Sequence, residues 1–305
     1  GSYREWLIAY IDEHPDFILP RTRRNDILGF LRQPLTDLCI SRPAQRLSWG
    51  IPIPFDPEYV TYVWFDALIN YVSTAGYLTR DDRFLSLWSN AVHLIGKDIL
   101  TTHCVYWPTM LKALGLNPPR TIFAHGWWTV EGQKMSKSLN NVVEPNSLIV
   151  RYGADPVRFF LLREGTFGLD ADFSHKAFIH RVNSDLANDL GNLFSRTLAM
   201  TAKYCSGSVP SPSDIEEVDR RLRDTALETV KRVDAAMAEI AFHRSLDAIW
   251  ELVGMTNKYI DESAPWSLAK RAGGEEQLAT VMYHVLESLR FIAVLLFPFI
   301  PASAE

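Results

Sequence analysis

Cysteine is scarce in this 305-residue sequence, and long apolar runs are absent. The three cysteines, Cys39, Cys104 and Cys205, are far apart and lack CxxC spacing, which argues against a disulfide framework and a four-ligand zinc site. The longest apolar run, Phe291 to Ile300, is interrupted by Pro298 and falls well short of a membrane-spanning length. We therefore expect no membrane association and, by default, a reducing cytoplasmic location.

An excess of basic charge is missing as well. The net charge is -5 at pH 7, so a nucleic-acid partner would need a local basic or aromatic patch instead of a global positive field. Hydrophobic residues make up 47% of the chain and aromatic residues 12%, which excludes intrinsic disorder. At about 150 residues per domain, the length predicts two domains.

The first half of the chain alternates short apolar strands with helices. An apolar period predicts two short helices within residues 3–32, and the prolines of residues 38–54 indicate strands at the margin of a small β element. Three further segments share one order of strand, polar or glycine-containing turn, and helix or hairpin, which is typical of a parallel sheet. We expect their strands at 61–65, 91–95 and 121–124.

Ligands bind at the carboxyl ends of the strands in an open parallel sheet. The residues that end or follow the three expected strands should therefore line one crevice. These residues are Trp64, Asp66, Gly96, Asp98, His125 and Gly126.

Beyond about Ser174 the pattern changes to long amphipathic helices without strand signals, which predicts an all-helical second domain. Apolar residues from Phe178 onward step by three or four and indicate a core-facing stripe, whereas Asn192 and Arg196 step by four on another face. Later helices are expected near 242–260 and 277–297.

The strongest local signal is the segment Lys134-Met135-Ser136-Lys137-Ser138, which follows Gly132. Two ammonium groups three residues apart on a glycine-started loop can converge on a polyphosphate and stabilise the negative charge that builds on a leaving pyrophosphate. The serine hydroxyls can add hydrogen-bond donors. The alternative is a solvated lysine loop, but this pentapeptide should occur by chance in only about one chain of this length in ten thousand.

Asp98 and the histidines each allow two interpretations. Asp98 follows a strand in a Gly-Lys-Asp turn, where an acidic side chain can hydrogen-bond a ribose hydroxyl, although an aspartate can also cap a helix there. His93, His103 and His125 could be imagined as a metal set. They lie on separate segments without a carboxylate pattern, so we expect no metal site.

The pentapeptide is the second signature of class I aminoacyl-tRNA synthetases, and the sequence around it resembles the methionyl-tRNA synthetases. The likeness extends along nearly the whole chain. It rests on residues 62–67 (YVWFDA), 95–99 (IGKDI), His103, Trp107-Pro108, His125-Gly126, 132–141 (GQKMSKSLNN), 152–158 (YGADPVR) and 264–266 (APW).

Two parts of the family pattern are missing from the sequence. The first class I signature, His-Ile-Gly-His, does not occur, and the zinc-bearing knuckle is absent too, so zinc is not expected. The resemblance implies that the chain is the C-terminal part of a longer enzyme, cut at both ends and inactive alone. The missing N-terminal half is then an expected partner.

The resemblance also implies a fold. It is an α/β fold in which the C-terminal half of a Rossmann-like catalytic domain is followed by an all-α helix-bundle anticodon-binding domain. The expected parts are residues 1–140 for the catalytic part with the lysine loop, 141–174 for a linker that contacts the tRNA stem, and 175–305 for the bundle. We expect the linker to fix the distance between anticodon and active site.

The implied reaction is the ATP-dependent activation of L-methionine to methionyl-adenylate and its transfer to tRNA(Met), with Mg2+ accompanying ATP. Catalysis is assigned to Lys134 and Lys137. The residues assigned to ATP are Gly96, Asp98, His125, Gly126, Trp128, Lys134, Ser136 and Lys137. The residues assigned to methionine are Trp64, Ala67, Tyr71, Ile99, His103 and Trp107. On the residues alone, Trp64 and Trp107 are typical of core aromatics.

Anticodon recognition is assigned to Asn192, Arg196 and Trp266, whose amide, guanidinium and indole groups suit base edges and base stacking. Without the resemblance, a solvated helix face and a sealed helix end would describe these residues better. Two alternative functions stay open. One is another class I synthetase, of the leucine, isoleucine, valine or cysteine type, and the other is a tRNA-binding module without catalysis.

Overall fold

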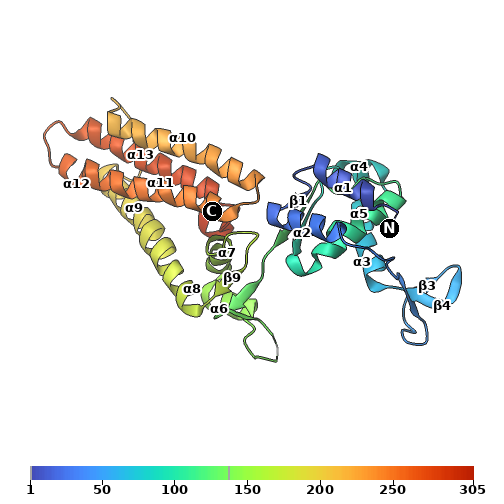
Figure 1. The fold of residues 1–305 in the computed structure, drawn as a ribbon. Coiled ribbons are helices and arrows are strands. Elements are labelled where there is room, and N and C mark those ends of the chain that lie inside the picture. Colours follow the sequence, from blue (N-terminus) through green and yellow to red (C-terminus); the bar gives the residue numbers. More distant parts are fainter. Residues whose placement is uncertain (1, 137) are drawn as a thin grey trace. The chain divides into compact units, whose positions relative to one another are not determined.

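The computed structural model describes residues 2–136 and 138–305, so Lys137 lies outside the described residues. The chain divides into two compact units, Gly1–Trp127 and Trp128–Glu305. Figure 1 shows the mixed helices and strands of the first unit and the long helices of the second.

A three-stranded parallel sheet in the order β1-β6-β5 forms the centre of the first unit. Its strands are β1 (Ile18–Leu19), β5 (Val92–Gly96) and β6 (Thr121–His125). The strands expected at 91–95 and 121–124 are confirmed. The sequence did not predict β1, because a two-residue apolar run has too little periodicity to classify.

The helices that precede and follow β1 in the sequence complete this core. They are α1 (Arg4–Glu13) and α2 (Arg21–Leu31), which confirm the expected pair. Leu7 of α1 and Ile27 of α2 are buried in one cluster with Ile122 of β6, so the apolar stripe of each helix packs on the sheet.

A second, antiparallel sheet confirms the small β element. It has the order β2-β4-β3, with β2 (Ser41–Pro43), β3 (Pro52–Ile53) and β4 (Asp56–Thr61). Pro43 and Pro52 lie on the two outer strands, where a missing backbone donor costs no central ladder bond.

The strand expected over 61–65 is wrong. β4 ends at Thr61 and α3 (Val63–Ala75) begins two residues later, with the backbone N–H groups of Phe65 and Asp66 donating to the carbonyl of Tyr62. The run of aromatic and β-branched residues favours a strand locally. The segment is helical because a helix places Leu68 and Val72 on one buried face. Consequently Trp64 and Asp66 lie on a helix that follows an antiparallel strand. They do not stand at the end of a parallel strand, as the predicted crevice required.

A helix with an irregular start follows β5, after α4 (Asp81–Trp88) has led into that strand. It begins as a 3-10 turn, η1 (Lys97–Ile99), widens to a π-helical turn, η2 (Thr102–Tyr106), and continues as α5 (Trp107–Ala113). The helix expected through His103 and Leu111 is confirmed. Single π-helical turns recur at functional sites, and this one contains His103.

The second unit opens with a small sheet in the order β8-β7-β9. Its strands are β7 (Trp128–Val130), β8 (Gln133–Lys134) and β9 (Ala171–Phe173). The expected hairpin is confirmed: Glu131 and Gly132 connect β7 and β8 with φ values of 51° and 73°. Glycine adopts this left-handed conformation without strain.

Helices make up the rest of this unit, and residues 174–305, all of them described, contain no strand. The helices are α6 (Pro145–Tyr152), α7 (Ala154–Arg163), α8 (His175–Arg181), η3 (Val182–Gly191), α9 (Asn192–Tyr204), α10 (Glu217–Ala238), α11 (Phe242–Ser263), α12 (Pro265–Leu268), α13 (Glu275–Leu296) and α14 (Pro301–Ala304). The all-helical prediction is confirmed. Figure 1 shows α10, α11 and α13 running side by side, and these helices contact one another.

The core of the bundle explains its most apolar helix. By length and composition α13 could cross a membrane. In the structure Met282 and Val285 of α13 are fully buried with Leu246 and Ile249 of α11. We therefore interpret α13 as the core helix of the bundle.

Hydrogen bonds join helix α7 to the C-terminal residues of the bundle. Arg158 donates from Nε to the carbonyl of Phe299 over 2.9 Å and from Nη2 to that of Pro298 over 2.8 Å. Asp155 accepts from the backbone N–H of Ser303 over 2.6 Å. The expected linker thus packs on the bundle within one compact unit, while the boundaries at 140 and 174 stay predictions.

Candidate functional site

The carboxyl ends of β5 and β6 bring three predicted ATP residues together. Gly96 lies directly opposite His125 in the parallel ladder. A Cβ at Gly96 would lie 2.6 Å from Oδ1 of Asp98, so a larger residue there would displace the carboxylate from this position. Oδ1 of Asp98 accepts from Nε1 of Trp127 over 3.4 Å. Because Gly96 is the residue that precedes the 3-10 turn, Asp98 lies inside the turn and does not cap it.

A cluster of aromatic rings in the same unit contains Trp64, Tyr71, His103 and Trp107, four of the residues predicted for methionine. Nδ1 of His103 lies 3.1 Å from the carbonyl of Ile99, and Nε2 lies 3.0 Å from the hydroxyl of Tyr71. A carbonyl only accepts, so Nδ1 carries the proton and Tyr71 donates to Nε2. Burial lowers the pKa of His103, against a smaller opposing effect of the Ile99 bond, and keeps the ring neutral.

Two tryptophans complete the cluster. The Trp64 ring lies 6.3 Å from the His103 ring in a T-shaped arrangement and is half-buried. Trp107 is 0% exposed and lies 6.0 Å from the Tyr71 ring. Ala67 precedes Tyr71 by one turn of α3 and is exposed. The structure therefore brings Trp64, Tyr71 and Trp107 together with His103, and Ile99 meets His103 through its backbone carbonyl. Trp107 also has the core role that the sequence alone indicated.

Two further members of the aromatic cluster, His93 and Trp88, were not among the residues predicted to bind methionine. His93 accepts a hydrogen bond at Nε2 from Nε1 of Trp107 over 3.1 Å. Trp88 packs edge-on against Trp107, with ring centroids 6.1 Å apart. From the sequence His93 suggests only a metal ligand, whereas the described residues contain no group of three His, Cys, Asp or Glu side chains able to hold a metal ion. The available signal was a histidine at an inward-facing position of β5, a strand buried on one face.

The lysine loop belongs to the second unit and is closed by its own polar groups. Asn141 accepts at Oδ1 from the backbone N–H of Ser136 over 2.8 Å and donates from Nδ2 to the carbonyl of Lys134 over 3.2 Å. Ser136 accepts at Oγ from the backbone N–H of Leu139 over 3.1 Å. The Lys134 side chain is exposed at the end of β8. The loop thus fixes its backbone while keeping an ammonium group at the surface.

Trp128 and Met135 connect this loop to the apolar core of its unit. Both belong to an apolar cluster built on Phe160 and Phe173, and the Trp128 ring lies 5.8 Å from that of Phe160. A cavity of about 230 Å³ remains in the cluster. Trp128, predicted to bind ATP, therefore serves as packing for the hairpin in this structure. Asp172 strengthens the same hairpin by accepting from Thr129 and from the backbone of Gly132.

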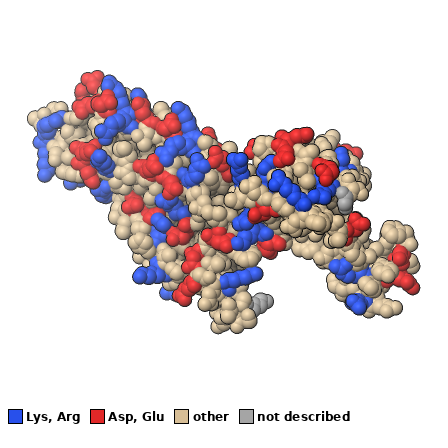
Figure 2. Space-filling view, in the orientation of Figure 1, with Lys and Arg blue, Asp and Glu red and all other residues tan. Residues whose placement is uncertain are grey.

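The predicted anticodon residues lie on α9 and α12. Asn192 is exposed and starts α9, and Arg196 follows one turn later. Trp266 is 42% exposed on the short helix α12. Figure 2 shows basic and acidic side chains interspersed on the visible face of the bundle, consistent with the many arginine–carboxylate pairs there. No uniform positive surface is visible on this face of the bundle.

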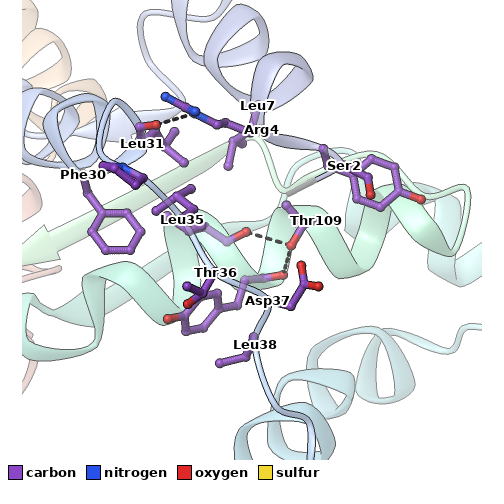
Figure 3. A pocket seen from close by; sticks show the side chains of 14 residues that line it. Ser2, Arg4, Leu7, Phe30, Leu31, Leu35, Thr36, Asp37, Leu38 and Thr109 are labelled. Atoms are coloured by element: carbon purple, nitrogen blue, oxygen red, sulfur yellow. Dashed lines mark hydrogen bonds between the residues drawn. The ribbon is translucent and has the colours of Figure 1, made fainter.

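A separate cavity of about 420 Å³ lies beside the continuous helix formed by η2 and α5 (Figure 3). Arg4 spans part of it and donates from Nε to the carbonyl of Leu31 over 2.6 Å. Val105 and Thr109 line it, two residues beyond His103 and Trp107, and so belong to a different helix face. None of the catalytic or binding residues predicted from the sequence lines this cavity.

Comparison with known proteins identifies the family. A sequence profile for "tRNA synthetases class I (M)" matches residues 1–198, and a profile for "Anticodon binding domain of methionyl tRNA ligase" matches residues 209–305. The methionine–tRNA ligase of Caldanaerobacter subterraneus subsp. tengcongensis is 50% identical over 100% of this chain and 48% of its own length. That of Bacillus subtilis is 47% identical over 100% of this chain and 46% of its own length.

Solved structures agree with this assignment. Mycobacterium tuberculosis methionyl-tRNA synthetase bound by methionyl-adenylate superposes with a TM-score of 0.95 at 42% identity, covering 99% of this chain and 60% of that one. This chain spans about half the length of the curated relatives it matches. Its fold is that of a class I synthetase catalytic domain and a helical anticodon-binding domain. The chain belongs to the methionyl family of class I tRNA synthetases, a family of aminoacyl-tRNA ligases.

Proposed function

We propose that the full-length protein joins L-methionine and ATP to form methionyl-adenylate and pyrophosphate, and then transfers the methionyl group to the terminal adenosine of tRNA(Met). Family membership supports the reaction class. The observation that carries the amino-acid choice is the aromatic cluster around Tyr71 and His103, in which both ring nitrogens of His103 already have partners. We propose this cluster as the wall of the methionine pocket.

This pocket suits a thioether. Tyr71, His103 and Trp107 present rings and a neutral imidazole, so a charged side chain would lose its hydration without gaining a counter-charge. A flexible, polarisable sulfur gains about 0.3–1.5 kcal/mol from each aromatic contact. We therefore favour methionine over the aliphatic substrates of the leucine, isoleucine and valine enzymes.

For ATP we propose a division of labour. Asp98 and Gly96 would hold the ribose, because a carboxylate beside a side-chain-free strand end can accept from sugar hydroxyls. Lys134 and Lys137 would neutralise the phosphates, most strongly as pyrophosphate leaves. Mg2+ would be carried largely by the phosphates and water, which is its usual preference, since the described residues gather no three-ligand cluster.

The test is amino-acid-dependent exchange of pyrophosphate into ATP by the full-length protein. We expect exchange with methionine, and little with leucine, isoleucine, valine or cysteine. Exchange with one of those four in place of methionine would establish the alternative synthetase. The 305-residue chain serves as the internal comparison, and we expect it to show no exchange, because the family's first signature is missing from its sequence.

The helical unit supports tRNA recognition as a separable function. It forms one compact unit with its own core, and Asn192, Arg196 and Trp266 offer an amide, a guanidinium and an exposed indole on its surface. We propose that they bind the CAU anticodon. Binding of the 305-residue chain to tRNA(Met), compared with the same tRNA carrying a changed anticodon, tests this, and equal affinities would argue against it.

A further inference from the structure

His93 is buried among the rings of the aromatic cluster. It is the second residue of β5, whose side chains alternate between two faces. His93 and Ile95 are 6% and 3% exposed, whereas Val92 and Leu94 are 42% and 55% exposed. The strand therefore directs the imidazole inward, toward the helices that carry the predicted methionine residues.

Rings from three elements surround this imidazole. Tyr71 of α3 stacks on it with centroids 4.2 Å apart and planes 22° apart. Trp88 of α4 and His103 of η2 approach it edge-on, at 5.8 Å and 6.5 Å. The stacked Tyr71 is the same residue whose hydroxyl donates to His103, so the position of that hydroxyl depends on the ring beneath it.

The hydrogen bond from Trp107 explains why an imidazole occupies this position. An indole N–H can only donate, and Trp107 is 0% exposed, so its donor needs a protein acceptor. Nε2 of His93 supplies one at 3.1 Å. An apolar side chain of equal size would fill the space but would leave the donor buried and unpaired. The position thus requires both a flat ring for Tyr71 and an acceptor for Trp107.

We propose that His93 is a positioning residue of the methionine pocket, which supports the Tyr71 ring and orients the Trp107 indole before the amino acid binds. The inference rests on the proposed function. In this proposal His93 acts on the amino acid through Tyr71, on which it stacks, and Trp107, from which it accepts a hydrogen bond. Its loss should therefore raise the KM for methionine and leave the KM for ATP unchanged.

The kinetic test uses pyrophosphate exchange by the full-length protein. His93→Phe keeps a ring but removes the acceptor, and we expect the KM for methionine to rise about tenfold, as for loss of one buried hydrogen bond. His93→Gln restores an acceptor and should recover part of that loss. Phe84→Leu is the control, since Phe84 is buried in the same cluster and stacks on Trp88 without joining the hydrogen bonds. An equal rise in KM for His93→Phe and Phe84→Leu would overturn the proposal.

A structural test on the 305-residue chain separates this inference from the reaction itself. The indole N–H resonance of Trp107, assigned with Trp107→Phe, should move in His93→Phe and return toward its original position in His93→Gln. An unmoved resonance would overturn the positioning role even in an active enzyme. Absence of any methionine-dependent exchange by the full-length wild type, with the resonance shift present, would instead refute the proposed function alone.

Discussion

Arg196 of α9 donates a hydrogen bond from Nη2 to Oδ1 of Asn257 on α11 over 2.8 Å. Asn257 in turn donates from Nδ2 to the carbonyl of Asp189 over 3.1 Å, so its amide orientation is fixed from both ends. Nη1 of Arg196 also contacts Asp261 over 3.2 Å. The guanidinium that we assign to the anticodon is therefore held in one direction by the bundle before any RNA arrives.

This relationship predicts the effect of Arg196→Gln. Loss of a pre-oriented guanidinium should weaken binding of tRNA(Met) by about 1.5–3 kcal/mol, the range for a hydrogen bond to a charged group. Arg290→Gln is the control, because it removes the same charge from a pair with Glu287 on α13. Binding can be measured by filter retention. Equal losses for the two variants would show that only net charge matters.

Trp266 provides a second test of the bundle. Stacking of an unpaired base on an exposed indole contributes about 1–3 kcal/mol, so Trp266→Ala should raise the Kd for tRNA(Met) about tenfold or more. Phe297→Ala is matched to it, since Phe297 is 54% exposed in the same unit. Methionine-dependent exchange should be unaffected by both. Loss of exchange in Trp266→Ala would indicate a structural role.

Lys134 tests the lysine loop. Its side chain is exposed and the loop backbone is held by Asn141, so Lys134→Ala should leave folding unchanged. Charge stabilisation that strengthens as pyrophosphate leaves appears mainly in kcat, and we expect adenylate formation to fall by about two orders of magnitude with little change in the Kd for tRNA. Single-turnover adenylation measures this. An unchanged rate would remove Lys134 from the mechanism.

The sequence predicted the elements whose pattern agrees with their final surroundings. The parallel strands at 91–95 and 121–124 and the helices after Ser174 are examples, since burial on a sheet or in a bundle reproduces the periodicity of the residues themselves. The segment 61–65 failed because its strand propensity was outweighed by packing of Leu68 and Val72.

The candidate site divides in the same way. Tyr71, His103 and Trp107 were predicted from resemblance and meet in the one aromatic cluster that we propose as the methionine pocket. His93 was not assigned to this pocket, because a lone histidine in a strand shows its role only when Trp107 is seen to donate to it. Whether the residues proposed for ATP and methionine bind those molecules stays a prediction.

Tyr71→Phe tests the hydroxyl of the pocket. The variant keeps the ring stacked on His93 but leaves Nε2 of His103 without its donor. An unpaired buried acceptor costs about 1–3 kcal/mol, so we expect the KM for methionine to rise fivefold or more while the KM for ATP stays unchanged. Steady-state exchange measures both constants. A rise shared by both constants would point to general loss of structure.

The last prediction concerns pH. Burial, with a smaller repulsion from His103, lowers the pKa of His93 from 6.5 to about 4, and the other titratable group facing it is the Tyr71 hydroxyl. Between about pH 6.5 and pH 4, His93 is protonated in the unfolded chain and neutral in the folded chain. Stability contributed by neutral His93 is therefore complete above pH 6.5 and is lost as the pH falls toward 4.

The size of the effect follows from the shift and is about 3 kcal/mol across that interval. Other buried histidines, such as His284, add losses of the same sign, so the wild type alone does not isolate His93. His93→Gln does, because it removes one titration and leaves the others. Urea unfolding of both chains at pH 7 and pH 4.5 should show His93→Gln destabilised at pH 7 and losing less of its stability on acidification. An identical loss in the two chains would mean that His93 does not sit neutral and buried against Trp107.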